Sequence, residues 1–222
     1  MRLDPISKSE AARYMGVRGA PDEQTQKLLD EAEKLVREGI APKYVYREAA
    51  VSFGEDGVYI EGMMVPLTGK DIKKHLTGCT RAVILAATMT ADADKLIRQA
   101  SVRGMAEALA ADCICSAAIE QVCDRAEEEI FSGKAAAFRT WRFSPGYGDL
   151  PLSLQRDILL YLNAARRIGL TVTENCLMLP SKSVTAIIGV SDVNLKKGAR
   201  GCAVCNMRES CAFSGKGGCG KH

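Results

Sequence analysis

Long hydrophobic runs are missing from this sequence of 222 residues. The longest, AVILAA at positions 82–87, is far shorter than the roughly 20 residues that a membrane-spanning helix needs. The N-terminal stretch MRLDPISKSEAARYMGVRG is polar and lacks the apolar centre of a secretory signal. We therefore expect no membrane association and a cytoplasmic location. Structural disulfides are not expected among the nine cysteines, because the cytosol keeps thiols reduced.

Charge of one sign and aromatic side chains are also scarce. The formal net charge is only +3, and 5% of the residues are aromatic. The basic residues are interleaved with acidic ones, whereas a nucleic-acid-binding surface needs a basic cluster. Few aromatic rings are available on which bases could stack. A nucleic-acid partner is therefore not expected.

Standard catalytic motifs are absent as well. The chain has no G-x-S-x-G, no H-E-x-x-H and no G-x-G-x-x-G after a strand. Its two histidines, His75 and His222, have no companions at the spacing of metal ligands or of a catalytic triad. Hydrolase, zinc-peptidase and dinucleotide-binding functions therefore find no support.

What the sequence does contain is a mixture of helical and strand-like patterns. Asp22 and Gly39 mark the start and end of an amphipathic helix. The other expected elements are strands at 43–53 and 57–62 around the turn GEDG, a buried strand at 81–88, helices over 92–130 broken near Gly104, one helix at 151–168, and strands at 170–179 and 183–190. The prediction is an α+β domain over 1–190, with a short cysteine-rich C-terminal tail over 191–222.

Four cysteines of the tail have the spacing C-x2-C-x5-C-x7-C: Cys202, Cys205, Cys211 and Cys219. Two cysteines separated by two residues can direct both thiolates at one metal, and the surrounding glycines allow a tight loop around it. Because the tail has few apolar side chains, a bound metal would explain how it folds. We expect an iron–sulfur cluster or a structural zinc, and the spacing does not decide between them; incidental thiols on a flexible tail are the alternative.

The stretch RFSPGYGDLP at 142–151 has the composition of a turn, with the means to bind a ligand. Arg142 offers a fork of donors suited to a carboxylate or phosphate. Pro145 and Gly146 favour a tight turn, and Tyr147 adds a ring and a hydroxyl group. A small ligand with a carboxylate, a cation and a flat ring would match this set, but a plain connection between helices would match it too.

The residues around this stretch resemble the activation domain of vitamin B12-dependent methionine synthase, especially its shorter, free-standing relatives. That family carries an R-x-x-x-G-Y loop, a helix and then a block of the type T-E-x-x-x-M-x-P-x-x-S-V. The matching residues here are Arg142, Gly146, Tyr147, Thr173, Glu174, Met178, Pro180, Ser183 and Val184. Order and spacing hold over about fifty residues, and ADCICSAAIEQVCDR is similar to the long helix of the family.

The resemblance implies a twisted antiparallel sheet with packed helices and a site for S-adenosylmethionine. Arg142 would pair with the ligand's carboxylate, the backbone of Ser144, Pro145 and Gly146 would hydrogen-bond the ligand, and Tyr147 would pack on it. The family tends to have an acidic residue near the ligand where this chain has Ser116. Glu120, one helical turn further on, is a possible substitute.

The resemblance also implies a function. The protein would support reductive methylation of the cobalamin of methionine synthase, or of a related corrinoid protein, in methionine biosynthesis. It would thus be a component of a methyltransferase activity. No D-x-H-x-x-G corrinoid signature is present, so a partner would carry the cobalamin. An electron donor is needed, and a cluster in the tail could relay its electrons. The alternative is an iron–sulfur electron-transfer module that acts on a corrinoid protein without binding S-adenosylmethionine.

Overall fold

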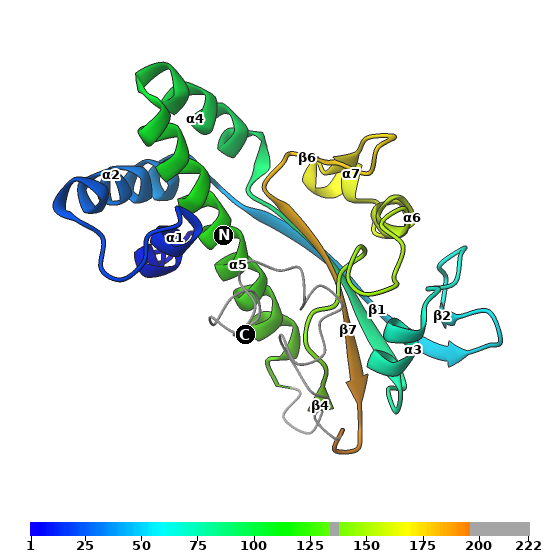
Figure 1. The fold of residues 1–222 in the computed structure, drawn as a ribbon. Helices are drawn as coiled ribbons and strands as arrows, with labels where there is room; N and C mark the ends of the chain where they lie inside the picture. Colours follow the sequence, from blue (N-terminus) through cyan, green and yellow to red (C-terminus); the bar gives the residue numbers. More distant parts are fainter. Residues whose placement is uncertain (134–137, 196–222) are drawn as a thin grey trace. The chain divides into compact units, whose positions relative to one another are not determined.

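The structure is a computed structural model that describes residues 1–133 and 138–195. Its helices are α1 (Lys8–Tyr14), α2 (Glu23–Gly39), α3 (Lys70–Leu76), α4 (Thr90–Arg103), α5 (Met105–Phe131), α6 (Leu154–Tyr161) and α7 (Ala164–Ile168) (Figure 1). Its strands are β1 (Lys43–Phe53), β2 (Val58–Ile60), β3 (Arg81–Thr88), β4 (Phe138–Arg139), β5 (Thr171–Val172), β6 (Met178–Leu179) and β7 (Ser183–Ser191). The described residues include no helix that is long and apolar enough to cross a membrane.

The main sheet has the strand order β2-β1-β3-β7-β4, and β5 and β6 form a separate antiparallel pair. Strand β3 occupies the centre of the main sheet, where Ala82 to Thr88 are buried, as the short apolar run predicted. Strands β1 and β2 pair antiparallel with Val51 opposite Ile60, which confirms the expected hairpin. Strand β4 is antiparallel to β7. The α+β class with an antiparallel sheet is thereby confirmed.

The chain divides into two compact units. The first unit comprises Met1–Tyr46, Leu85–Ala135 and Ile158–Thr185. The second comprises, of the described residues, Arg47–Ile84, 138–157 and 186–195.

Helix α5 is the centre of the first unit, and α1, α2 and α4 pack against it. Its 27 residues are rich in alanine, whose small side chain allows neighbouring helices to approach closely. Cys113, Cys115 and Cys123 are buried along it, where they act as small core side chains. Burial raises the pKa of the Cys115 thiol to about 12, so this thiol stays protonated and unreactive near neutral pH.

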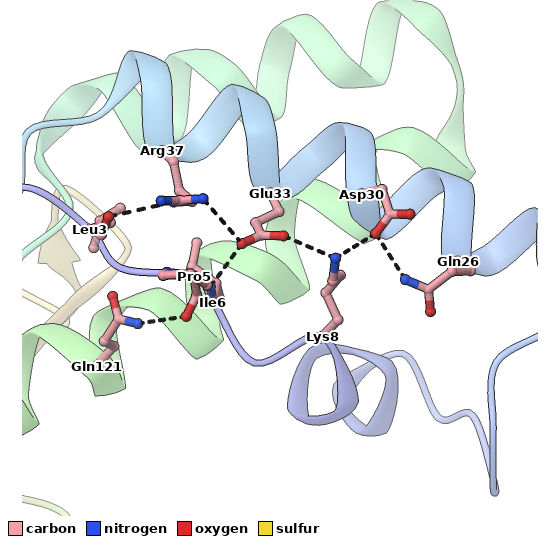
Figure 2. A network of polar contacts seen from close by, with 9 residues as sticks. All are labelled: Leu3, Pro5, Ile6, Lys8, Gln26, Asp30, Glu33, Arg37 and Gln121. Carbon is pink, nitrogen blue, oxygen red and sulfur yellow. Dashed lines mark hydrogen bonds and ion pairs between the residues drawn. The ribbon is translucent and has the colours of Figure 1, made fainter.

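The N-terminal segment is held to α2 and α5 by polar contacts as well as by the buried side chains of Leu3 and Ile6 (Figure 2). The Glu33 carboxylate accepts a hydrogen bond of 2.9 Å from the backbone N–H of Ile6. It also forms ion pairs with Lys8 at 3.2 Å and with Arg37 at 3.8 Å. Only 8% of Glu33 is exposed, so these partners satisfy a carboxylate that would otherwise be costly to bury.

Two expectations about residues 151–179 were wrong. The expected single helix at 151–168 is two helices, because Asn163 takes a left-handed conformation (φ 52°) between α6 and α7. Gly169 ends α7 in a left-handed conformation, as expected of a C-cap. Residues 170–179 do not form one strand: β5 and β6 contain two residues each and are joined by a turn in which Cys176 has a φ of 60°.

Candidate functional site

Residues 143–150 form a compact turn in the second unit. The amide of Tyr147 donates to the carbonyl of Ser144 at 3.1 Å, and the amide of Leu150 donates to the carbonyl of Tyr147 at 3.0 Å. The amide of Gly146 donates to the carbonyl of Leu150 at 2.9 Å. Gly146 and Gly148 have φ angles of 91° and 55°, which other residues adopt only with strain. Gly146 and Gly148 are therefore needed for the turn itself.

The start of this turn is fixed to strand β7. Phe143 and Ile187 exchange two backbone hydrogen bonds, of 3.0 and 2.8 Å. The Phe143 side chain is 9% exposed, and its ring meets that of Tyr147 edge-on at 6.2 Å between centroids. Phe143 thus gives the turn a buried base, whereas Tyr147 is 61% exposed.

The end of the turn is fixed to helix α3. The Asp149 carboxylate accepts hydrogen bonds from the amides of Lys70 at 2.7 Å and Asp71 at 3.0 Å, the first two residues of that helix. These amides, that of Asp71 first, lower the pKa of Asp149 below its ordinary value of 3.8. The carboxylate is therefore ionised at neutral pH.

The other end of α3 contacts the residues just before the turn. The His75 Nε2 atom lies 2.8 Å from the Thr140 hydroxyl oxygen, which also accepts a hydrogen bond of 2.8 Å from the amide of Gly189. The His75 ring meets Trp141 edge-on at 4.7 Å and lies 4.9 Å from the Phe143 ring. Residues 140–149 therefore contact α3 at both of its ends.

The structure places the site residues predicted from the sequence in both units. Arg142, Ser144, Pro145, Gly146 and Tyr147 are brought together in the second unit, where Pro145 is buried and Gly146 and Tyr147 are exposed. Glu120 lies in α5 of the first unit, where it is half-buried. Asp149 was not predicted as a site residue, because the helix amides that it holds lie 79 positions away in the sequence.

The T-E-x-x-x-M-x-P-x-x-S-V block builds local structure in the first unit. The Thr173 hydroxyl accepts a hydrogen bond from the amide of Leu177 at 3.1 Å and so closes the turn between β5 and β6. The Ser183 hydroxyl is buried and lies 2.8 Å from the Thr88 hydroxyl and 2.7 Å from the Pro180 carbonyl. These contacts explain why hydroxyl-bearing residues occupy two positions of the block.

Ser116, where the family tends to carry an acidic residue, is part of a small polar cluster in the first unit. Its hydroxyl accepts a hydrogen bond of 2.9 Å from the ammonium group of Lys182 and donates one of 3.0 Å to the Asp112 carbonyl. Lys182 also pairs with the Asp112 carboxylate at 2.8 Å, and its side chain is only 16% exposed. Lys182, which was not predicted as a site residue, therefore places a positive charge beside Ser116.

The proposed metal ligands Cys202, Cys205, Cys211 and Cys219 lie outside the described residues. Within 1–133 and 138–195, no group of three or more His, Cys, Asp or Glu side chains could hold a metal ion. Cys79, in this part of the chain, has a thiol pKa raised to about 11 by burial. The cysteines of the tail therefore remain a prediction from spacing alone.

Comparison with known proteins supports the resemblance seen in the sequence. Residues 77–194 match the family model described as vitamin B12 dependent methionine synthase, activation domain. The fold is similar to that in the crystal structure of the MetH reactivation domain bound to AdoHcy, with a TM-score of 0.64 at 18% sequence identity. That similarity covers 87% of this chain and 76% of the other. No curated protein matches the sequence. Because the matched residues make up more than half of the sequence, the chain belongs to the family of vitamin B12-dependent methionine synthase activation domains.

Proposed function

We propose that this protein binds S-adenosylmethionine at residues 142–147 and supports the reductive methylation of cobalamin carried by a partner. The partner would be a cobalamin-binding methionine synthase or another corrinoid protein. The observation that carries the proposal is the glycine-dependent turn at 143–150, which holds the family's R-x-x-x-G-Y residues in one place and leaves Tyr147 exposed. The solved neighbour, a reactivation domain bound to AdoHcy, supports the same choice of ligand.

The residues of the turn fit the chemistry of this ligand. The Arg142 guanidinium can form two parallel hydrogen bonds with a carboxylate. The exposed ring of Tyr147 provides a face for a flat ring or for a sulfonium cation. The amide of Gly146 is already used inside the turn, so Gly146 would contact the ligand through its carbonyl oxygen.

The protein's share of the reaction is to position the ligand. When bound, the sulfonium compound supplies an activated methyl group, and an external donor supplies the electron that the cobalt needs. Arg142 and Tyr147 would hold the two ends of the ligand, so that its methyl group faces the partner. Positioning of this kind lowers the barrier without any acid or base from the protein.

Calorimetric titration with S-adenosylmethionine tests the proposal. The wild-type protein should bind, and Arg142→Ala should weaken binding by roughly 1.5–3 kcal/mol, the range for charge-assisted hydrogen bonds. Arg98→Ala, which removes an exposed arginine from α4 in the first unit, is the matched control and should bind as the wild type does. The proposal fails if the wild type gives no heat of binding either alone or in the presence of a cobalamin-loaded partner.

We also propose that the tail binds an iron–sulfur cluster through Cys202, Cys205, Cys211 and Cys219 and passes electrons to the partner. The C-x2-C-x5-C-x7-C spacing supports a metal site, and an electron is needed for each reactivation. Protein purified without oxygen should contain iron and acid-labile sulfide. Zinc without iron or sulfide would make the tail a structural zinc site and would rule out the electron relay.

A further inference from the structure

Helix α3 begins without a capping side chain of its own. The residue before it, Gly69, has no side chain to offer, and its φ is 128°. The first amides of a helix have no partner inside the helix and need one from outside. Asp149, 79 positions away from Lys70 in the sequence, supplies both oxygens of its carboxylate to the first two amides. Asp149, a residue of the candidate ligand turn, thus caps the N-terminus of α3.

Glycines on both sides allow this contact. A Cβ atom at Gly69 would lie 2.5 Å from Oδ1 of Asp149, too close for any real contact. A Cβ atom at Gly148 would overlap the Asp71 carboxyl group. Because Gly69 and Gly148 have no side chains, the backbone of the turn and that of α3 can approach each other closely.

The position of Asp149 is coupled to that of Tyr147 through two hydrogen bonds. Leu150, the next residue, accepts from the amide of Gly146 and donates to the carbonyl of Tyr147. A shift of Asp149 would therefore be passed directly to the two residues that end the R-x-x-x-G-Y motif. At its other end, α3 carries His75, which contacts Thr140, Trp141 and Phe143.

We propose that Asp149 is a positioning residue for the ligand turn, and that α3 is the rigid support against which it holds that turn. This inference rests on the proposed binding of S-adenosylmethionine at 142–147. It extends the binding machinery to residues 69–76, which precede the part of the chain that the family model matches. Asp149 acts through the turn and does not itself contact the ligand.

The simpler alternative is that Asp149 only stabilises the second unit. Helix α2 offers a matched control, because Asp22 accepts a hydrogen bond of 2.7 Å from the amide of Thr25 and caps that helix locally. Asp149→Ala and Asp22→Ala each remove a capping carboxylate from a helix. If the role of Asp149 were only structural, both variants would lose stability and both would keep the wild-type affinity in their folded form.

The experiment compares affinities for S-adenosylmethionine by calorimetry on folded protein. We expect Asp149→Ala to bind at least about tenfold more weakly, since two charge-assisted hydrogen bonds that set the turn are lost. Asp149→Asn, which keeps one acceptor oxygen, should lie between this variant and the wild type. Asp22→Ala should be indistinguishable from the wild type. Circular dichroism confirms folding, and Asp149→Asn carries the test if Asp149→Ala does not fold.

Trp141, the only tryptophan of the chain, gives a second readout that needs no ligand. Its emission should shift in Asp149→Ala and stay unchanged in Asp22→Ala. The positioning role is overturned if the Asp149 variants bind within about twofold of a wild type that does bind. A wild type that fails to bind would instead overturn the proposed function, so the two failures are distinguishable.

Discussion

Glu33 and Asp149 each hold distant backbone amides, and they do so in contrasting surroundings. Glu33 in the first unit is buried, is paired with Lys8 and Arg37, and fixes the amide of Ile6 (Figure 2). Asp149 in the second unit is exposed and fixes the amides of Lys70 and Asp71.

We expect the Glu33 contacts to matter mainly for folding stability, and the Asp149 contacts mainly for the shape of the candidate site. The segment held by Glu33 also buries the side chains of Leu3 and Ile6. Loss of the Glu33 contacts would therefore disturb both the hydrogen bond of the Ile6 amide and the packing of these two side chains. The turn held by Asp149 buries only Phe143, Pro145 and Leu150 and presents Gly146 to Gly148 to solvent. Stability should therefore depend more on Glu33, and the shape of the candidate site more on Asp149.

The largest effect on stability is expected from Glu33→Ala. The variant leaves the buried amide of Ile6 without its acceptor and removes two ion pairs, which should lower the free energy of unfolding by about 2–3 kcal/mol. Urea unfolding measures the change. Asp30→Ala is the control, since Asp30 also pairs with Lys8 but is half exposed, and it should cost much less. Equal losses in the two variants would contradict the structural role of Glu33.

A loss of at most similar size is expected from Gly148→Ala. Any alanine in the left-handed region costs about 1–2 kcal/mol, and here the added methyl group also displaces the Asp71 carboxyl group. Gly16→Ala is a matched control, because Gly16 has a φ of 84° but no atom within 4 Å of the added carbon. Unfolding free energies should show that Gly148→Ala is the more costly by about 1 kcal/mol. If the two variants lose the same amount, the contact between the turn and α3 is looser than described.

A local effect is expected in the hydrogen exchange of the helix amides. In Asp149→Ala, the amides of Lys70 and Asp71 should exchange faster, because they have lost the carboxylate that accepts their hydrogen bonds. In Asp22→Ala, the faster exchange should be at Thr25 instead. Exchange measured by mass spectrometry on short peptides resolves the two regions. Unchanged exchange at 70–71 would mean that Asp149 does not cap α3.

The same comparison shows why part of the structure could be predicted and part could not. The α2 helix was predicted with its cap because Asp22 directly precedes an amphipathic pattern that ends at Gly39, and the structure shows Asp22 capping the helix through the nearby amide of Thr25. The buried strand at 81–88 was predicted from its continuous apolar run. Helix α3 was not predicted, because its capping carboxylate lies 79 positions away and Gly69 gives no start signal. Local sequence patterns predict contacts between residues that are close in the sequence, but not contacts between residues that are far apart in it.

The candidate site shows the same limit. The motif at 142–147 and the need for a tight turn were visible in the sequence, because arginine, proline and glycine have local consequences. The elements that the turn contacts could not be predicted. Phe143 forms backbone hydrogen bonds with Ile187 of β7, and its ring lies against His75 of α3. The break at Asn163, which splits the expected helix of 151–168, was also missed, since asparagine is only an occasional left-handed residue.

The subtlest effect is the pH dependence of the Asp149 contact. Hydrogen bonds from the amides of Asp71 and Lys70 lower the pKa of Asp149 below 3.8, and the nearby charge of Lys70 acts in the same direction. Because the pKa is lower in the folded protein, the stabilisation is fully present above about pH 3.8 and is lost as the pH falls through the lowered value. Trp141 emission should therefore change at this acidic pH in the wild type. Asp149→Asn has no group to titrate there, so it should lack that step, while the acidic changes that arise from other carboxylates persist. An identical acid transition in both proteins would show that the turn keeps its shape without the charge of Asp149, and would place the role of that residue in its hydrogen-bond acceptor and not in its charge.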